Sequence, residues 1–218
     1  MLQCTIYLSI QHCKSPFLLM NKAFSIHTHS HTFFILYANK NRAFVSSSCS
    51  SMIHKGCRIR DFYAGDYKIV IQLISNIIVN EFKFKLEFDN LDSDLLHIEE
   101  HYGKSNHGCF WVAEILDNNS RSNIKIIATT AIRRLKQFES TCELKRMYVL
   151  KQYRGLGIGQ MMLDKAIGFA KEAGYSRILL DSSKNLRAAR RLYLKNGFVD
   201  TQRYNDNYRA DIFMEKWL

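Results

Sequence analysis

The sequence predicts a mixed α/β domain that begins near Met52 and has the element order β-α-α-β-β-β-α-β-α-β-β. Three observations predict this class. Segments with apolar residues at helical spacing alternate with short apolar segments bounded by turn residues. The segment between two predicted strands begins with the turn-forming residues 117–120 (DNNS), which indicates a hairpin. A further strand and helix are joined by a loop with glycine at three alternate positions.

The sequence of the first half of the domain predicts one strand and two helices. The strand is residues 57–62 (CRIRDF). The apolar face of the first helix follows the repeat i, i+3, i+4, i+7, i+8, in Val70, Leu73, Ile74, Ile77 and Ile78. The second helix has Asp92 or Ser93 as a candidate cap near its start. Its apolar face consists of Leu91, Leu95, Ile98 and Tyr102.

The second half predicts three consecutive strands and then alternating helices and strands. The three strands are residues 109–116, 124–132 and 143–150. The glycine loop is followed by a helix with an apolar face from Met162 to Ala170, a buried strand at 177–181, and a helix through 188–193 that ends at Asn196-Gly197. The closing strands are residues 197–204 and 210–217.

Residues 1–51 differ from the rest of the chain in composition. They contain four basic residues, nine serines and no Asp or Glu, and no apolar period of 2 or 3.6 is sustained. We therefore predict a poorly structured leader. Two origins are possible. The segment can be an organellar transit segment, although it contains only one arginine, Arg42, or it can be upstream sequence in front of a true start at Met52.

The composition restricts the location of the protein and the type of ligand. No apolar run reaches the roughly 18 residues that span a bilayer, and the six cysteines have neither CxxC nor metal-ligand spacing. We expect reduced thiols, no membrane partner and a cytoplasmic protein, with organellar import if the leader is genuine. Of the net charge of +11, residues 143–218 carry +7, from fifteen basic and eight acidic side chains. This bias fits a solvated surface or a site for a phosphorylated ligand, and no basic-aromatic motif points to nucleic acid.

The loop at residues 154–159 (RGLGIG) carries the most specific functional signal. It holds Gly155, Gly157 and Gly159, three of only 10 glycines in the chain. Backbone N–H groups at a helix start are unpaired and carry the positive end of the helix dipole. Glycine lets the backbone approach a ligand closely, and Arg154 adds a forked donor. The spacing is neither the G-x-G-x-x-G of dinucleotide binders nor a loop followed by GK[ST]. The loop therefore predicts a phosphate site.

The same residues resemble the R-x-x-G-x-G signature of the GNAT superfamily of N-acetyltransferases. The similarity covers about residues 52–218. It extends to FWVAE (110–114), ELKRMYV (143–149) and AARRLYLKNGF (188–198), which is similar to the second cofactor motif of the family. The resemblance implies an N-acetyltransferase domain at 52–218 with the GNAT fold, a mixed, mostly antiparallel sheet flanked by helices.

The resemblance also implies that acetyl-CoA binds as the acyl-donor co-substrate, without a metal. Its pantetheine arm would follow Met147, Tyr148 and Val149, where the fourth and fifth strands splay apart, and the Val149 amide would polarise the thioester carbonyl. Asn185, near the start of the last helix, is a further candidate contact. The pyrophosphate would lie on the loop and the first helical turn, at Arg154, Gly155, Leu156, Gly157, Ile158, Gly159 and Gln160.

Two residues are candidates for proton transfer on the strength of this resemblance. Tyr193 lies where many members of the family place the tyrosine that protonates the leaving thiolate, and a phenol donates without prior ionisation. Glu143 lies where some members carry a general base, with Glu114 as an alternative. Each has a structural alternative, since Tyr193 can simply pack its helix against the sheet and Glu143 can form an ion pair at the strand edge.

The acceptor is predicted only as a primary amine, on a small molecule or a protein. Residues 87–100 contain six carboxylates, which can attract a cationic amine or form a solvated helix face. The predicted function is transfer of the acetyl group by direct attack in a ternary complex. The alternative is a catalytically inactive CoA-binding or interaction module with the same fold. The sequence leaves open whether the protein forms a homodimer.

Overall fold

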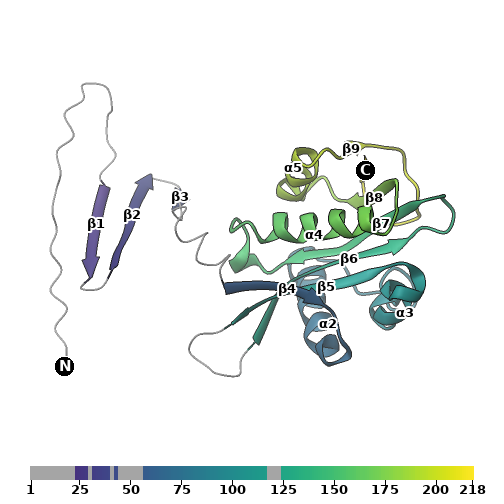
Figure 1. Ribbon diagram of the computed structural model, residues 1–218, viewed down its shortest axis with the longest axis horizontal. Helices are drawn as coiled ribbons and strands as arrows, with labels where there is room; N and C mark the ends of the chain where they lie inside the picture. The colour runs from purple at the N-terminus through teal and green to yellow at the C-terminus, as the bar shows by residue number, and fades with distance from the viewer. Residues whose placement is uncertain (1–22, 29–30, 40–41, 44–55, 117–123) are drawn as a thin grey trace. The chain divides into compact units, whose positions relative to one another are not determined.

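The computed structural model describes residues 23–28, 31–39, 42–43, 56–116 and 124–218 (Figure 1). The chain divides into two units, residues 1–55 and 56–218. In the first unit, β1 (Ala23–Thr28), β2 (His31–Asn39) and β3 (Arg42–Ala43) form an antiparallel sheet in the order β1-β2-β3. The sequence predicts no regular element in this segment. The predicted turn at 117–120 lies outside the described residues.

The second unit is built on a seven-stranded sheet with the order β4-β5-β6-β7-β8-β10-β9. Its strands are β4 (Cys57–Asp61), β5 (Cys109–Leu116), β6 (Ile124–Arg134), β7 (Thr141–Val149), β8 (Arg177–Ser182), β9 (Val199–Asp200) and β10 (Ile212–Trp217). Neighbouring strands are antiparallel except β7 and β8, which are parallel. The predicted class, a mixed and mostly antiparallel sheet, is confirmed.

Helices cover both faces of this sheet (Figure 1). On one face lie α2 (Tyr67–Ser75), which continues as a π-helix at Asn76–Glu81, and α3 (Ile98–Tyr102). On the other face lie α4 (Ile158–Glu172) and α5 (Arg187–Lys195). Short 3-10 turns occur at Ala64–Asp66, Ser93–Leu95, Lys104–Asn106 and Lys151–Tyr153. None of the helices in the described residues is long and apolar enough to cross a membrane.

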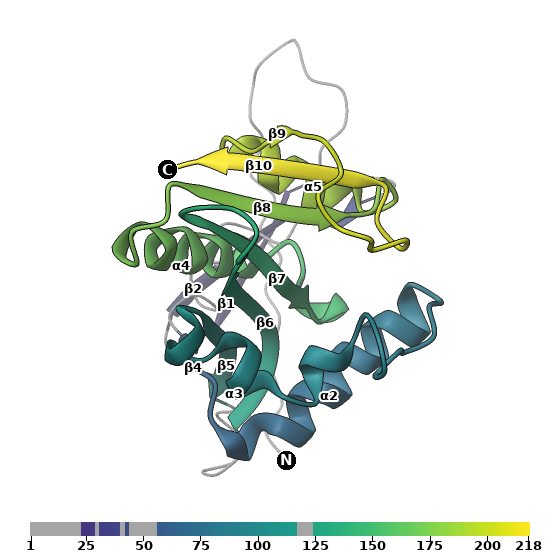
Figure 2. The same cartoon turned by 90° about the vertical axis from the view of Figure 1, so that its right-hand side faces the viewer.

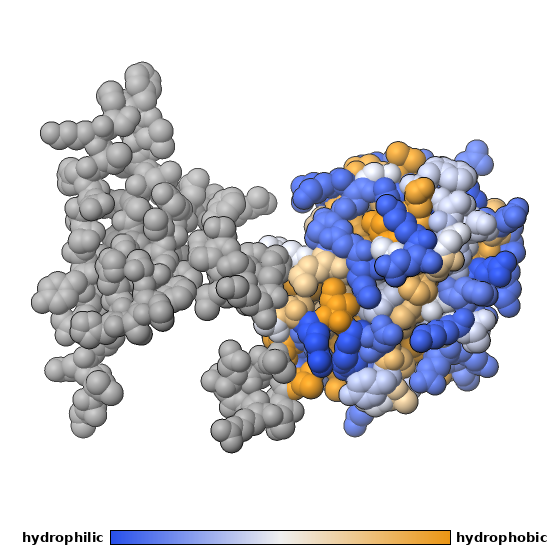
Figure 3. All heavy atoms as spheres, viewed as in Figure 1, coloured by the Kyte–Doolittle hydropathy of each residue, from blue (hydrophilic) through white to orange (hydrophobic). Residues whose placement is uncertain are grey.

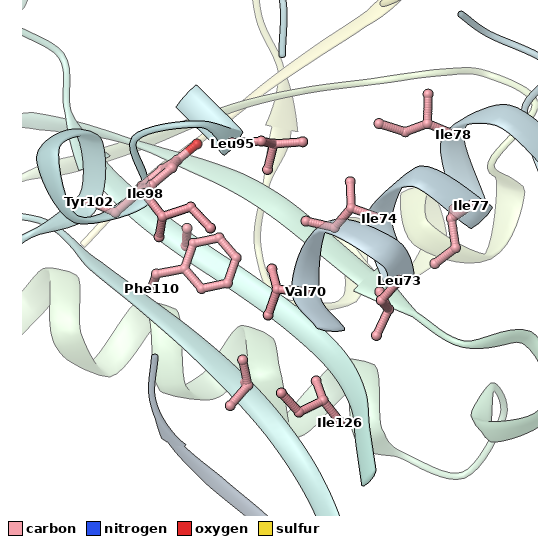
Figure 4. Packing of buried hydrophobic residues seen from close by; sticks show 12 residues of the cluster. Val70, Leu73, Ile74, Ile77, Ile78, Leu95, Ile98, Tyr102, Phe110 and Ile126 are labelled. Atoms are coloured by element: carbon pink, nitrogen blue, oxygen red, sulfur yellow. The ribbon is translucent and has the colours of Figure 1, made fainter. Parts of the chain in front are cut away.

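The core under α2 and α3 follows the predicted helical repeat. All five apolar residues of the first predicted face, Val70, Leu73, Ile74, Ile77 and Ile78, are buried against β5 and β6, where they meet Phe110 and Ile126 (Figure 4). The ring of Tyr102 packs edge-on against Phe110 with 5.6 Å between the ring centroids. Burying each such aliphatic side chain contributes about 1.5–3 kcal/mol, so this face fixes α2 on the sheet. The face drawn in Figure 3 is mixed, with hydrophilic residues interrupted by hydrophobic patches.

Two predicted elements are shorter than expected. The helix predicted over Leu91–Tyr102 is a 3-10 turn followed by the five residues of α3, because the carboxylates of Asp92 and Asp94 bind Arg146 of β7 instead of capping a continuous helix. The strand predicted at 197–204 is reduced to β9. Arg203 donates to the carbonyls of Asn205, Asn207 and Ala210, which holds the following segment as a loop.

Candidate active site

The site begins where β7 and β8 separate. The two strands pair only over Thr141–Glu143 and Arg177–Leu179, and then diverge (Figure 2). On its other side β7 pairs with β6 through a register shift between Thr129 and Ala131. Arg146 occupies this bulge with φ 50°, in the left-handed region, and its carbonyl accepts a 2.7 Å hydrogen bond from Thr129 Oγ1. The bulge turns the end of β7 away from β8 and opens the sheet.

The predicted phosphate loop follows β7 and leads into α4. Gly155 (φ 78°) and Gly157 (φ 83°) adopt the left-handed conformation that only glycine takes without strain. Among the described residues, the N–H groups of Gly155, Leu156 and Gly157 make no hydrogen bond to the main chain outside helices and strands. The first turn of α4, from Ile158, adds the unpaired amides that every helix start carries. The loop therefore presents a concentration of free donors, and pyrophosphate fits that chemistry.

The Arg154 side chain has a different position from the one expected. Its Nε donates to the Val149 carbonyl at 2.8 Å, and its Nη1 donates to Glu81 Oε2 at 2.7 Å. Glu81 ends the π-helix after α2. The guanidinium, 41% exposed, thus links the phosphate loop to the opposite wall of the opening, and phosphate would have to compete with Glu81 for it.

The start of α4 is also fixed to α5. Gln160 Nε2 donates to Asn196 Oδ1 at 2.8 Å, and Asn196 Nδ2 donates back to Gln160 Oε1 at 3.1 Å. Gly159 lies close to Leu192, which a Cβ on this glycine would meet at 3.5 Å. Gln160 therefore positions the helix carrying Tyr193, in addition to its expected place beside the loop. Asn185 is exposed, and its N–H donates to Ser183 Oγ; its neighbours Ser183 and Leu186, not Asn185 itself, line the cavity described next.

A cavity of about 150 Å³ lies in the opening between β7 and β8. Met147 and Tyr148, both expected along the pantetheine arm, line it together with Tyr193. The opposite wall comes from the end of α2 and the segments after it, with Ile78, Phe82, Phe84 and Leu91. Its charged lining residues are Asp92, Lys145, Arg146, Asp181 and Arg209.

Tyr193 is a buried proton donor in this cavity. Its side chain is 6% exposed, and its hydroxyl donates to Met147 Sδ at 3.7 Å. Burial raises the pKa of Tyr193, and the negative charge of Asp181 raises it further, so the phenol keeps its proton at neutral pH. The ring also packs against Phe198 at 5.8 Å between centroids. Tyr193 thus has both the packing role and a hydroxyl available at the cavity.

The carboxylates of Glu143 and Asp181, near β7 and β8, differ in whether they line the cavity. Glu143 is fully buried, does not line the cavity, and pairs with Arg133 Nη2 at 2.6 Å. It also accepts a 2.9 Å hydrogen bond from the Tyr204 hydroxyl. Asp181, which the sequence did not single out, lines the cavity and accepts hydrogen bonds from Asn205 Nδ2 at 2.7 Å and Lys145 Nζ at 3.3 Å.

The ionisation of Asp181 follows from these contacts. Burial alone would raise the pKa of Asp181, but the Lys145 charge and the hydrogen bonds from Asn205 and Asn207 outweigh it and lower the pKa below the usual value. Asp181 is therefore a carboxylate at neutral pH. Glu114, the other alternative base, is buried at the far edge of the sheet, where it binds Arg58 and Arg60 of β4.

The cavity wall formed by the segments after α2 is held by buried ion pairs. Arg146 Nε donates to Asp94 Oδ2 and its Nη1 to Asp92 Oδ1, each at 2.9 Å, and the Tyr102 hydroxyl also binds Asp94. Arg209, on the loop before β10, donates to Asp92 Oδ2 at 2.9 Å and to the Lys85 carbonyl at 2.6 Å. The acidic run 87–100 is thus divided: Asp92 and Asp94 are buried in ion pairs, which neither predicted interpretation anticipated, whereas Asp89, Glu99 and Glu100 are exposed, as expected of a solvated face.

No metal-binding group is evident in the part of the chain that the structure describes: no three His, Cys, Asp or Glu residues lie close enough to hold an ion. Cys57, Cys109 and Cys142 are free thiols, and Cys4, Cys13 and Cys49 lie outside the described residues. Burial raises the pKa of Cys109 and of Cys142 to about 12 in each case, so neither is a nucleophile at neutral pH.

The fold and the glycine loop define a class, and comparison with known proteins places the chain in it. Residues 74–198 match the Acetyltransferase (GNAT) family model, and the chain belongs to this family. It is 30% identical over 140 residues to the probable N-acetyltransferase camello of Xenopus tropicalis, across 62% of this chain and 61% of that protein. It is 31% identical over 142 residues to an uncharacterized N-acetyltransferase of Schizosaccharomyces pombe, across 65% of this chain and 80% of that protein.

The same fold occurs in solved structures. An acetyltransferase of the GNAT family from Staphylococcus aureus superposes with a TM-score of 0.65 and 29% identity, over 74% of this chain and 98% of that chain. The similarity to camello covers less than two thirds of that protein's length. Family membership therefore describes the domain, and the activity of the whole protein is inferred below.

Proposed function

We propose that this protein transfers the acetyl group of acetyl-CoA to a primary amine by direct attack within a ternary complex. The observation that carries the proposal is the joining of two features in one opening of the sheet. Free backbone amides at 155–159 lie at one end, and a small cavity with a phenol and a carboxylate lies at the other. A binding module needs the first feature only.

The residues divide the reaction between them. Acetyl-CoA supplies the thioester whose C–S bond breaks while the amine nitrogen bonds to the carbonyl carbon. The free amides of the loop bind the pyrophosphate, and Met147 and Tyr148 line the path of the arm. The Val149 amide is proposed to stabilise the negative charge on the carbonyl oxygen. Tyr193 donates its hydroxyl proton to the leaving sulfur and is reprotonated from solvent.

The proposed acceptor of the amine proton is Asp181, in place of Glu143. Asp181 lines the cavity, whereas Glu143 is fully buried and paired with Arg133. Because its pKa is low, Asp181 remains an acceptor that orients the amine and passes the proton on to water. Glu143 positions this group indirectly, since Asn205 Nδ2 donates to both carboxylates, at 3.2 Å to Glu143 and 2.7 Å to Asp181.

The test is whether the protein releases CoA from acetyl-CoA only when an amine is present. Purified protein is mixed with acetyl-CoA and a panel of small amines, amino acids and peptides. Free thiol is followed by absorbance, and products by mass spectrometry. We expect thiol release with an equal amount of N-acetylated product, and slower release in Asp181→Asn. Tight acetyl-CoA binding with no amine-dependent thiol release from any acceptor would instead identify an inactive CoA-binding module.

A further inference from the structure

Arg209 has a buried donor that the protein does not satisfy. Among the buried side-chain nitrogen and oxygen atoms of the described residues, only Thr130 Oγ1 and Arg209 Nε lack a hydrogen-bond partner. The Arg209 side chain is 10% exposed and lines the cavity. Leaving a buried donor of a charged group unpaired is unfavourable, so an unpaired donor at a candidate site indicates a missing partner.

The guanidinium cannot turn to satisfy this nitrogen from within the protein. Its Nη1 is held by Asp92 at 2.9 Å, and its Nη2 by the Lys85 carbonyl at 2.6 Å. Its plane also lies over the Phe84 ring, 5.6 Å from the centroid. Since the group is fixed on three sides, the remaining Nε–H is a preset donor for one oxygen atom.

Asp181 and Arg209 line the same small cavity. A carboxylate that accepts from an amine and a guanidinium N–H that donates to an oxygen are the two complementary groups for an amine with an oxygen close by. The cavity that they share has a volume of about 150 Å³. An α-amino acyl group, in which the amine and a carbonyl or carboxylate oxygen share one carbon neighbour, meets this requirement.

We propose that the acceptor is the α-amino group of an amino acyl unit, with Arg209 Nε donating to its carbonyl or carboxylate oxygen. This inference rests on the proposed acetyl transfer. The unit can come from a free amino acid or from the first residue of a peptide. A lysine side-chain amine or a polyamine carries no such oxygen and would leave Arg209 Nε unpaired.

The experiment compares acceptors that differ only in the oxygen-bearing group. Alanine, leucine, phenylalanine and lysine are each tested beside their amides, a dipeptide with the same first residue, and the amine left when the carboxylate is removed. Nα-acetyl-lysine tests the side-chain amine. We expect kcat/KM for the best amino acyl acceptor to exceed that of its decarboxylated amine by at least about 100-fold, because a site built to bond an oxygen rejects the analogue lacking it.

The variant Arg209→Lys keeps the positive charge beside Asp92 and removes Nε. It should lower kcat/KM for the amino acyl acceptor toward that of the decarboxylated amine, with little change for the amine itself and for acetyl-CoA affinity. Tyr208→Phe is the matched control, because Tyr208 is next to Arg209 on the same loop and does not line the cavity; its hydroxyl contacts Glu87, which also pairs with Arg209 Nη2 at 3.2 Å. The discrimination should survive in this variant. Melting temperatures establish that both variants fold.

The outcomes separate the two proposals and the two sources. Equal rates with the amide and the dipeptide identify a peptide N-terminus, whereas activity with the free acid alone identifies an amino acid. Acetyl transfer to decarboxylated amines or to Nα-acetyl-lysine at equal or higher efficiency overturns the amino acyl inference and leaves acetyl transfer intact. Discrimination that persists in Arg209→Lys overturns the role of Arg209. No transfer to any acceptor overturns the proposed function itself.

Discussion

The two sides of the opening between β7 and β8 are built in different ways. The side proposed for acetyl-CoA is formed by consecutive residues, from Met147 to Gln160, and its donors are main-chain amides. The acceptor side is assembled from distant segments, and its charges pair with each other. Asp92 alone joins Arg146 and Arg209, which are 54 and 117 residues away in the sequence. The side proposed for acetyl-CoA thus depends on a local backbone shape, whereas the side proposed for the acceptor depends on long-range ion pairs.

The largest effect should come from the residue that acts between the two sides. Tyr193→Phe removes the hydroxyl and keeps the ring against Phe198, so folding and acetyl-CoA affinity should change little. The turnover number should fall about 10²–10⁴-fold, the usual size for the loss of a general acid, and kcat should fall more than the KM for acetyl-CoA rises. Steady-state kinetics with calorimetry measures both. A variant that melts earlier but keeps its kcat would make Tyr193 a packing residue.

The next largest effect should be a loss of folding stability when an ion pair on the proposed acceptor side is removed. Asp94→Asn leaves Arg146 buried with one carboxylate fewer, and we expect it to lower the free energy of unfolding by about 2–4 kcal/mol at pH 7. Burial would raise the pKa of Asp94, but Arg146 and the Tyr102 hydroxyl outweigh it, and the pKa is about 2. Asp94 therefore stabilises the fold above its unfolded pKa, near 4, and this contribution is lost as pH falls toward 2.

Urea unfolding of Asp94→Asn and the original protein between pH 3 and 7 checks this dependence. The difference in unfolding free energy should be constant above about pH 5 and should shrink below pH 4. Asp89→Asn is the matched control, because Asp89 is an exposed carboxylate of the same acidic run, and its effect should stay within about 0.5 kcal/mol at pH 7. A pH-independent difference for Asp94→Asn would mean that the ion pair with Arg146 is not its cause.

A third effect concerns the cofactor side alone. Gly157→Val places a β-branched side chain at φ 83°, which costs about 1–3 kcal/mol of backbone strain or displaces the loop. Acetyl-CoA affinity should fall by about tenfold or more, since the amides would move. Gly159→Ala is the control: its Cβ meets Leu192 at 3.5 Å and Met147 at 3.9 Å, both ordinary contact distances, and affinity should be nearly unchanged. Isothermal titration measures the acetyl-CoA affinity of both variants. Equal affinities would mean that the loop is not the phosphate site.

The same contrast explains what the sequence could predict. The helical repeat from Val70 to Ile78 and the alternate glycines impose local conformations, so the element order and the loop were predictable from neighbouring residues. The shortened α3 was not, because the carboxylates of Asp92 and Asp94 find Arg146 only in the folded sheet. Asp181 could have been noticed as the acidic end of a buried strand facing Tyr193 in the next motif. Arg209 had no local signal, since its role depends on three segments that meet in space.

The smallest expected effect lies at the contact that joins the two sides, Arg154 with Glu81. Since the Arg154 guanidinium is 41% exposed and already bound to Glu81 and the Val149 carbonyl, Arg154→Ala should reduce acetyl-CoA affinity by a few-fold at most. A surface ion pair is worth only about 0.2–1 kcal/mol.

Glu81→Gln sharpens the comparison, because it removes the competing carboxylate and leaves Arg154 in place. If Arg154 turns onto the pyrophosphate when acetyl-CoA binds, Glu81→Gln should raise the affinity slightly, and this gain should disappear in the double variant with Arg154→Ala. If Arg154 stays on Glu81 throughout, the two single variants should have the same small effect, and the main-chain amides alone would hold the phosphate. Titration of the three variants at low salt, where an exposed charge has most influence, distinguishes these results.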